Sequence, residues 1–188
     1  MTNLKPFRDY SEHDVVNLFS FAGSVPIEPG SLVKVVSNYK DANGEISKFA
    51  DLSSVGGAIS ASFGTFGQVD IVQNYNDVPA PIGILLKGVK SVDENGTPLV
   101  FEPRMTAERN IVLPHQAVPI LTRGVVLINN IDTSDIDGDG LDGGLPQAGD
   151  ALYVGNNGRL ATEGLIKAGI CLSSIDSEGY CLVKLNIA

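Results

Sequence analysis

The chain has 188 residues, of which 43% are hydrophobic and 19% are charged, and its formal net charge is −9 at neutral pH. A chain of this size is expected to form about one domain that buries roughly 70% of its unfolded surface. The negative charge argues against a nucleic-acid partner, because binding to phosphates needs clustered Lys and Arg. No apolar run of roughly 18 residues occurs, so no membrane span is predicted, and the first ten residues lack the apolar core of a secretory signal.

Glycine and proline are frequent, with 21 and 10 copies, and good helix formers show no helical periodicity. Short apolar segments rich in β-branched residues are instead bounded by turn residues, as in all-β domains. The fold class predicted is all-β, a small β-barrel or β-sandwich with an extended N-terminal arm. We expect strands near residues 32–36, 69–72, 82–92, 99–101, 111–113, 118–121, 125–128 and 151–154.

Residues 1–24 differ from the rest and are interpreted as the arm, followed by one domain at residues 25–188. Four of the chain's twelve Phe and Tyr residues lie in the arm, and Pro6 disfavours a helix before it. An aromatic-rich terminal segment either packs back on its own domain or docks on a neighbour. The candidate docking residues are Pro6, Phe7, Arg8, Tyr10, His13, Val16, Leu18 and Phe19.

Two pairs of segments resemble each other within the chain. Residues 28–35 (EPGSLVKV) resemble residues 147–154 (QAGDALYV), and residues 80–86 resemble residues 167–172. The domain is therefore expected to contain two related β-units packed into one core. Two loop insertions interrupt it, near residues 53–67 and 132–146, and the first lacks the Gly-Lys-Ser/Thr ending of a phosphate loop.

The C-terminal segment is predicted to form a β-hairpin whose connection is residues 176–179. In this register Ile175 lies opposite Tyr180 and Leu172 opposite Val183, which gathers the apolar side chains on one face. Cys171 and Cys181 then point to opposite faces. We therefore expect two free thiols, as in a reducing compartment, and no disulfide.

The segment Asp132–Asp142 is rich in carboxylates at alternate positions. Asp135, Asp137 and Asp139, followed by Gly140, match the first half of a calcium loop, with Asp142 as a further ligand. The position of the closing bidentate Glu is occupied by Pro146. A calcium site is therefore weighed against a solvated acidic loop.

The sequence offers little for catalysis, and no enzyme is predicted. The two histidines, His13 and His115, lie outside any nucleophile motif, and the cysteines lack the spacing of a zinc site.

Two parts of the chain resemble tailed-bacteriophage capsid decoration (cement, or head-stabilising) proteins. One is the N-terminal LKPFRDYSEHDVVNLF of residues 4–19. The other is the C-terminal set GDALYV (149–154), NGRL (157–160), Gly169-Ile170 and YCLVKL (180–185). The resemblance covers roughly a third of the chain.

The resemblance implies a small β-barrel-like structural virion protein that binds the outside of an expanded head. Its partner would be the major capsid protein, its oligomer a homotrimer, and its place the capsid exterior after assembly in the host cytoplasm. The arm would dock by adding a strand to the edge of a capsid-protein sheet, and several arms per oligomer would add avidity. The alternative is a virion-surface adhesion or receptor-binding module that uses the two loop insertions.

Overall fold

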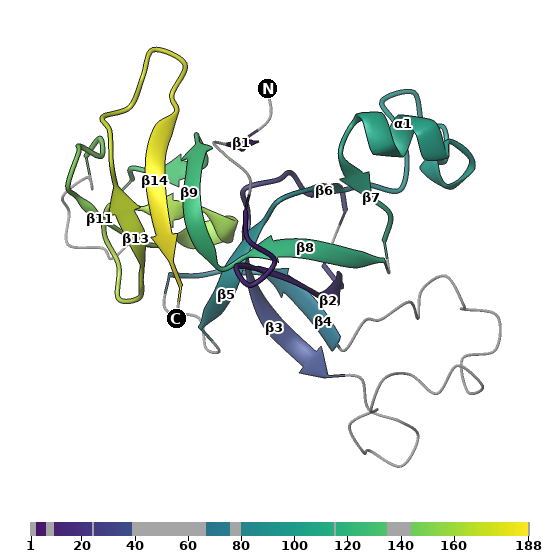
Figure 1. Cartoon of the computed structure of the whole chain (residues 1–188), viewed down its shortest axis with the longest axis horizontal. Helices are drawn as coiled ribbons and strands as arrows, with labels where there is room; N and C mark the ends of the chain where they lie inside the picture. The colour runs from purple at the N-terminus through teal and green to yellow at the C-terminus, as the bar shows by residue number, and fades with distance from the viewer. Residues whose placement is uncertain are drawn as a thin grey trace.

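The computed structural model describes residues 3–6, 10–23, 25–38, 67–75, 80–114, 116–134 and 144–187. These residues form an all-β fold, as predicted, built from a closed barrel, a curled sheet and a small lobe (Figure 1). No helix in this part of the chain is long and apolar enough to cross a membrane.

The closed barrel contains strands in the order β2-β4-β3-β5-β8. Their bounds are Val15–Phe21 (β2), Leu32–Asn38 (β3), Gly67–Ile71 (β4), Pro81–Leu85 (β5) and Ala117–Leu121 (β8). β2 closes the ring, because it pairs antiparallel with β8 and parallel with β4.

The curled sheet has seven strands in the order β1-β9-β14-β13-β11-β12-β10. It comprises Leu4–Pro6 (β1), Arg123–Ile128 (β9), Ile131–Asp132 (β10), Ala151–Val154 (β11), Leu160–Ala161 (β12), Lys167–Cys171 (β13) and Cys181–Asn186 (β14). β10 continues β9 almost directly and pairs parallel with β12 at the far end of the sheet. The sheet therefore curls round on itself.

The strand pairing of the curled sheet repeats that of the barrel. β3 pairs with β5, and β11 pairs with β13, and both pairs have a one-residue bulge at the same place. The partners are Leu32–Ile84, Val33–Gly83 and Lys34–Pro81 in one pair, and Ala151–Ile170, Leu152–Gly169 and Tyr153–Lys167 in the other. Strands β2, β3, β4, β5 and β8 thus correspond to β9 with β10, β11, β12, β13 and β14. This agrees with the two related units expected from the sequence.

Backbone hydrogen bonds at the strand entrances repeat as well. Gly30 N donates to Leu85 O at 2.7 Å, and Gly149 N donates to Cys171 O at 2.8 Å. Both glycines have a positive φ, 86° for Gly30 and 100° for Gly149. Residues other than glycine adopt this backbone conformation only at a cost in free energy. The Pro-Gly and Ala-Gly steps in the two similar segments therefore mark the same turn into the sheet.

Two apolar clusters form the core. One fills the closed barrel and includes Val33, Leu85 and Ile120. The larger cluster joins the inner side chains of the curled sheet, such as Leu152 and Val183, to residues on the outer face of the barrel. The two units therefore share one continuous core rather than standing apart.

The C-terminal hairpin forms, but the register predicted for it is wrong by one residue. Cys171, rather than Leu172, lies opposite Val183. Asp176 Oδ1 accepts hydrogen bonds from the backbone N–H groups of Glu178 and Tyr180, which makes a tight turn. Between that turn and β13 the ladder is interrupted, and Ser173 Oγ accepts a bond from Leu182 N at 3.0 Å. Pairing counted outward from the turn therefore misplaces the strand.

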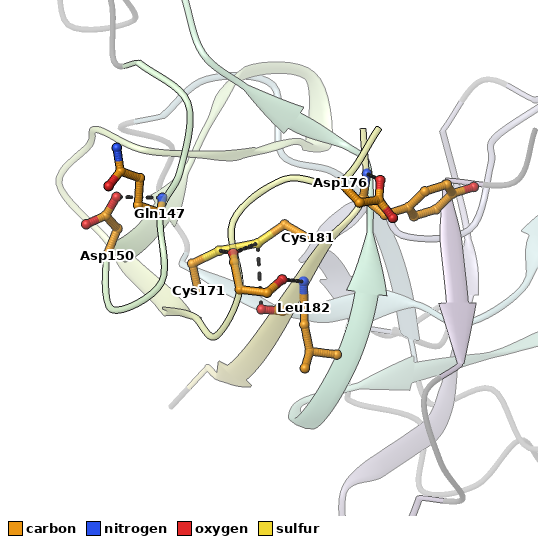
Figure 2. Close-up of a disulfide and its surroundings, with 8 residues drawn as sticks. Gln147, Asp150, Cys171, Asp176, Cys181 and Leu182 are labelled. Atoms are coloured by element: carbon orange, nitrogen blue, oxygen red, sulfur yellow. Dashed lines mark hydrogen bonds between the residues drawn. A yellow bond between two sulfur atoms is a disulfide. The ribbon is translucent and has the colours of Figure 1, made fainter. Parts of the chain in front are cut away.

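This shift also overturns the expectation of free thiols, because Cys171 and Cys181 form a disulfide (Figure 2). Both cysteines are fully buried on the inner face, and their Cα atoms lie 6.8 Å apart. The corresponding barrel residues are Leu85 and Val118, which are also fully buried. The disulfide therefore occupies positions that the other unit fills with apolar side chains.

The connection from β5 to β8 forms the small lobe, which projects from the barrel (Figure 1). It contains Gly88–Val89 (β6), a 3-10 turn at Leu99–Phe101 (η1), Pro103–Glu108 (α1) and Ile111–Val112 (β7). A turn lies within the lobe, where Asp93 Oδ1 accepts hydrogen bonds from the backbone N–H groups of Asn95 and Thr97. The strand predicted at residues 99–101 is wrong, because Pro98 and Pro103 flank a helical segment there.

Candidate functional site

The described part of the predicted arm is built into both units. β1 pairs with β9 at the edge of the curled sheet, and β2 is one of the strands that close the barrel. Leu4 and Phe21 are buried, with 4% and 3% of their surface exposed. The prediction of an extended N-terminal arm is therefore wrong for these residues. Two apolar segments of the predicted arm are instead strands that complete the core.

Lys5 holds β1 to the C-terminal hairpin. Its Nζ lies 2.9 Å from Glu178 Oε2 and 4.0 Å from the centre of the Tyr180 ring. The hydrogen bond to the Glu178 carboxylate is the main cause that raises the pKa of Lys5. Because both charged groups are exposed, this pair orients the strand more than it stabilises the fold.

Some of the other candidate docking residues pack against the domain, and others are exposed to solvent. Tyr10 donates to Val125 O at 3.2 Å, and its ring covers Gly124. Phe19 packs against the barrel core, and Val16 is half-buried in β2. His13 and Leu18 are exposed, Leu18 to 45%. Pro6 takes part in β1, while Phe7 and Arg8 lie outside the described residues.

The calcium prediction concerns residues that the structure does not describe, since Asp135, Asp137, Asp139 and Asp142 all lie within the gap at 135–143. Most of the insertion near residues 53–67 and His115 also lie outside. Across the ranges that are described, no group of three or more His, Cys, Asp or Glu could hold a metal ion. The calcium site therefore stays a prediction.

The surface beside the lobe contains a groove that sequence reasoning missed. A groove of about 850 Å³ runs between the lobe, β1 and the segment before β3. Two ion pairs lie along it, with Lys90 Nζ 2.7 Å from Glu28 Oε1 and Arg109 Nη1 3.6 Å from Glu94 Oε1. Leu4 and Lys5 line the groove, so part of the predicted arm does border it.

The lobe next to this groove presents apolar side chains to solvent. Phe101 is 77% exposed and Val100 is 59% exposed, although both belong to the ordered turn η1. Val92, at the mouth of the groove, is 45% exposed. The equivalent connection in the curled sheet is the short hairpin turn at Asp176–Gly179. The lobe is thus an addition that the barrel does not need for closure, and it carries exposed apolar surface.

Comparisons with family models, curated proteins and solved structures find no match to this chain. The geometry is therefore the guide to function. Neutralised charges, a shallow groove and projecting apolar side chains are features of a surface that contacts another protein.

Proposed function

We propose that the protein is a structural virion protein that binds the outside of a phage head and stabilises the lattice of the major capsid protein. The observation that carries the proposal is the projecting lobe, whose Phe101 and Val100 are exposed without being needed for barrel closure. The sequence resemblance to capsid decoration proteins supplies the class of partner. A net charge of −9 suits an outward-facing surface, because an inward one would meet packaged DNA.

The lobe and the groove beside it form the docking surface in this proposal. Exposed aromatic side chains that fit a partner's pocket dominate the binding energy of many interfaces. Lys90 is already paired with Glu28, and Arg109 with Glu94, so docking over these four charges leaves none of them without a partner. The N-terminal segment contributes through side chains that its strands leave exposed, His13 and Leu18, and a homotrimer would multiply these contacts.

The proposal is tested by measuring binding to empty heads assembled from the major capsid protein. The double variant Val100→Ser, Phe101→Ser removes the apolar tip. Burying a Phe side chain contributes about 1.5–3 kcal/mol, so we expect at least a tenfold weaker affinity. The fold should persist, since both side chains are mostly exposed.

Leu165→Ser is the matched control, because Leu165 is 75% exposed but lies in the curled sheet's β12–β13 connection, away from the lobe. It should bind heads like the unmodified protein. Equal binding by the lobe variant would refute the assignment to the lobe. Failure of the unmodified protein to bind heads would refute the proposed function itself.

A further inference from the structure

The outer face of the curled sheet corresponds to a face that the barrel already uses as an interface. On the barrel, Leu121 lies opposite both Val15 and Ile84, and Ile84 lies opposite Leu32. Leu32, Ile84 and Leu121 are fully buried in the core shared with the curled sheet. This row of side chains therefore serves as the contact between the two units.

The corresponding row on the curled sheet is partly exposed to solvent, at Ile170 and Lys184. Lys184 lies opposite both Val125 and Ile170, and Ile170 lies opposite Ala151. Ile170 is 37% exposed, and Leu172, at the end of the same strand, is 44% exposed. Val125 and Ile170 correspond to Val15 and Ile84 of the barrel, so these two positions have the same residue type in both units. The position of the buried Leu121 is instead occupied by the exposed Lys184. The face has kept part of its apolar character and gained a cation.

Two further cations lie around this row. Arg123, Lys167 and Lys184 line a hollow of about 510 Å³ together with Gly169, Ile170 and Asn186, and none of the described residues that line it is acidic. Arg123 is oriented by Asn186, whose Oδ1 accepts a bond from Nε at 3.2 Å. Within the described part of the chain, none of these three cations forms an ion pair. In a chain with 22 acidic and 13 basic side chains, this gathering of cations is a local reversal of charge.

We infer that this face, defined by Arg123, Lys167, Ile170, Lys184 and Asn186, binds an acidic segment of another protein. Carboxylates of the segment would meet the three cations, and an apolar side chain between them would cover Ile170. Charge complementarity selects the partner, because cations that form no ion pair with the described residues attract acidic groups. Nucleic acid is disfavoured, since the net charge of −9 repels a long polyanion and the apolar Ile170 side chain lies among the cations. This inference does not depend on the proposed binding to phage heads.

The test uses the full-length protein and a fluorescent peptide of sequence EELEE, with KKLKK and EESEE as companions. We expect EELEE to bind in low salt, KKLKK not to bind, and EESEE to bind less tightly because it lacks the apolar side chain. Lys184→Glu and Arg123→Glu should each weaken EELEE binding at least tenfold. Lys87→Glu is the matched control, since it makes the same charge change away from this hollow, and it should bind within about twofold of the unmodified protein.

Other results would overturn the inference. Equal loss with Lys87→Glu would mean that net charge alone attracts the peptide. Tighter binding of a ten-nucleotide oligothymidylate than of EELEE would assign the face to nucleic acid. Self-association that Lys184→Glu abolishes, measured by light scattering, would make a second copy of this chain the occupant instead. Arg123 and Lys184 are exposed and Lys87 is half-buried. Melting temperatures that match the unmodified protein would confirm that each variant is folded.

Discussion

Reduction of the Cys171–Cys181 disulfide to two thiols should lower the stability of the protein without any substitution in the sequence. The bond links residues ten apart in sequence, so it restricts a short loop of the unfolded chain. The chain-entropy relation gives about 2.7 kcal/mol for a loop of this length at 25 °C. With a urea dependence of about 2–3 kcal/mol per molar, the unfolding midpoint should fall by roughly 1 M.

The assay is urea unfolding followed by circular dichroism, with and without reductant, and thiol titration of the unfolded protein to confirm each redox state. The double variant Cys171→Ala, Cys181→Ala is the control, since its midpoint should not respond to reductant. A reduced protein with the midpoint of the oxidised one would show that the link does not constrain the unfolded chain. Two reactive thiols in protein unfolded without reductant would show that the bond is absent.

Two other predictions follow from the repeated units and from the placement of β2. A Cβ added at Gly83 would collide with Leu121 O, and one at Gly169 would lie 2.5 Å from Lys184 O, so Gly83→Ala and Gly169→Ala should each destabilise the protein by about 1–3 kcal/mol in thermal melts. Gly96→Ala, with φ of +81° but no atom within 4 Å, should cost only about 1 kcal/mol. An equal cost at all three glycines would contradict the collision argument, and a large cost at only one of Gly83 and Gly169 would contradict the equivalence of β5 and β13. Deletion of residues 1–21 should abolish cooperative unfolding, because it removes β2 and leaves β4 and β8 with unpaired edges. A truncated protein that still melts cooperatively would show that the barrel tolerates the loss of β2.

Much of the secondary structure was readable from the sequence, because each strand carries its own signal. The strands at Leu32–Asn38, Ala117–Leu121 and Arg123–Ile128 follow from β-branched runs bounded by turn residues. The internal repeat was visible for the same reason, since the glycines that turn the chain into β3 and β11 are local requirements. The lobe was missed at Leu99–Phe101, where apolar residues suit a strand but the flanking prolines favour a helical turn.

The candidate sites were less predictable, because each depends on segments far apart in the sequence. The groove brings residues near position 5 beside residues near 90 and 109, and the basic hollow collects side chains from β9, β13 and β14. The Phe101 side chain is apolar, and only the tertiary fold shows that it is left outside the core.

The sequence by itself determined that the chain is all-β, that it contains two related units and that its surface is acidic. These properties depend on composition and on neighbours within a few residues. The tertiary structure alone decided the hairpin register, and with it the disulfide. Residues 168–172 (AGICL) carry no polar side chain, so alternation does not choose between two adjacent registers, and the interrupted ladder at Ser173 selects one of them. It also decided that the N-terminal segment completes two sheets, since its partners β4, β8 and β9 lie about 50 to 125 residues away in the chain.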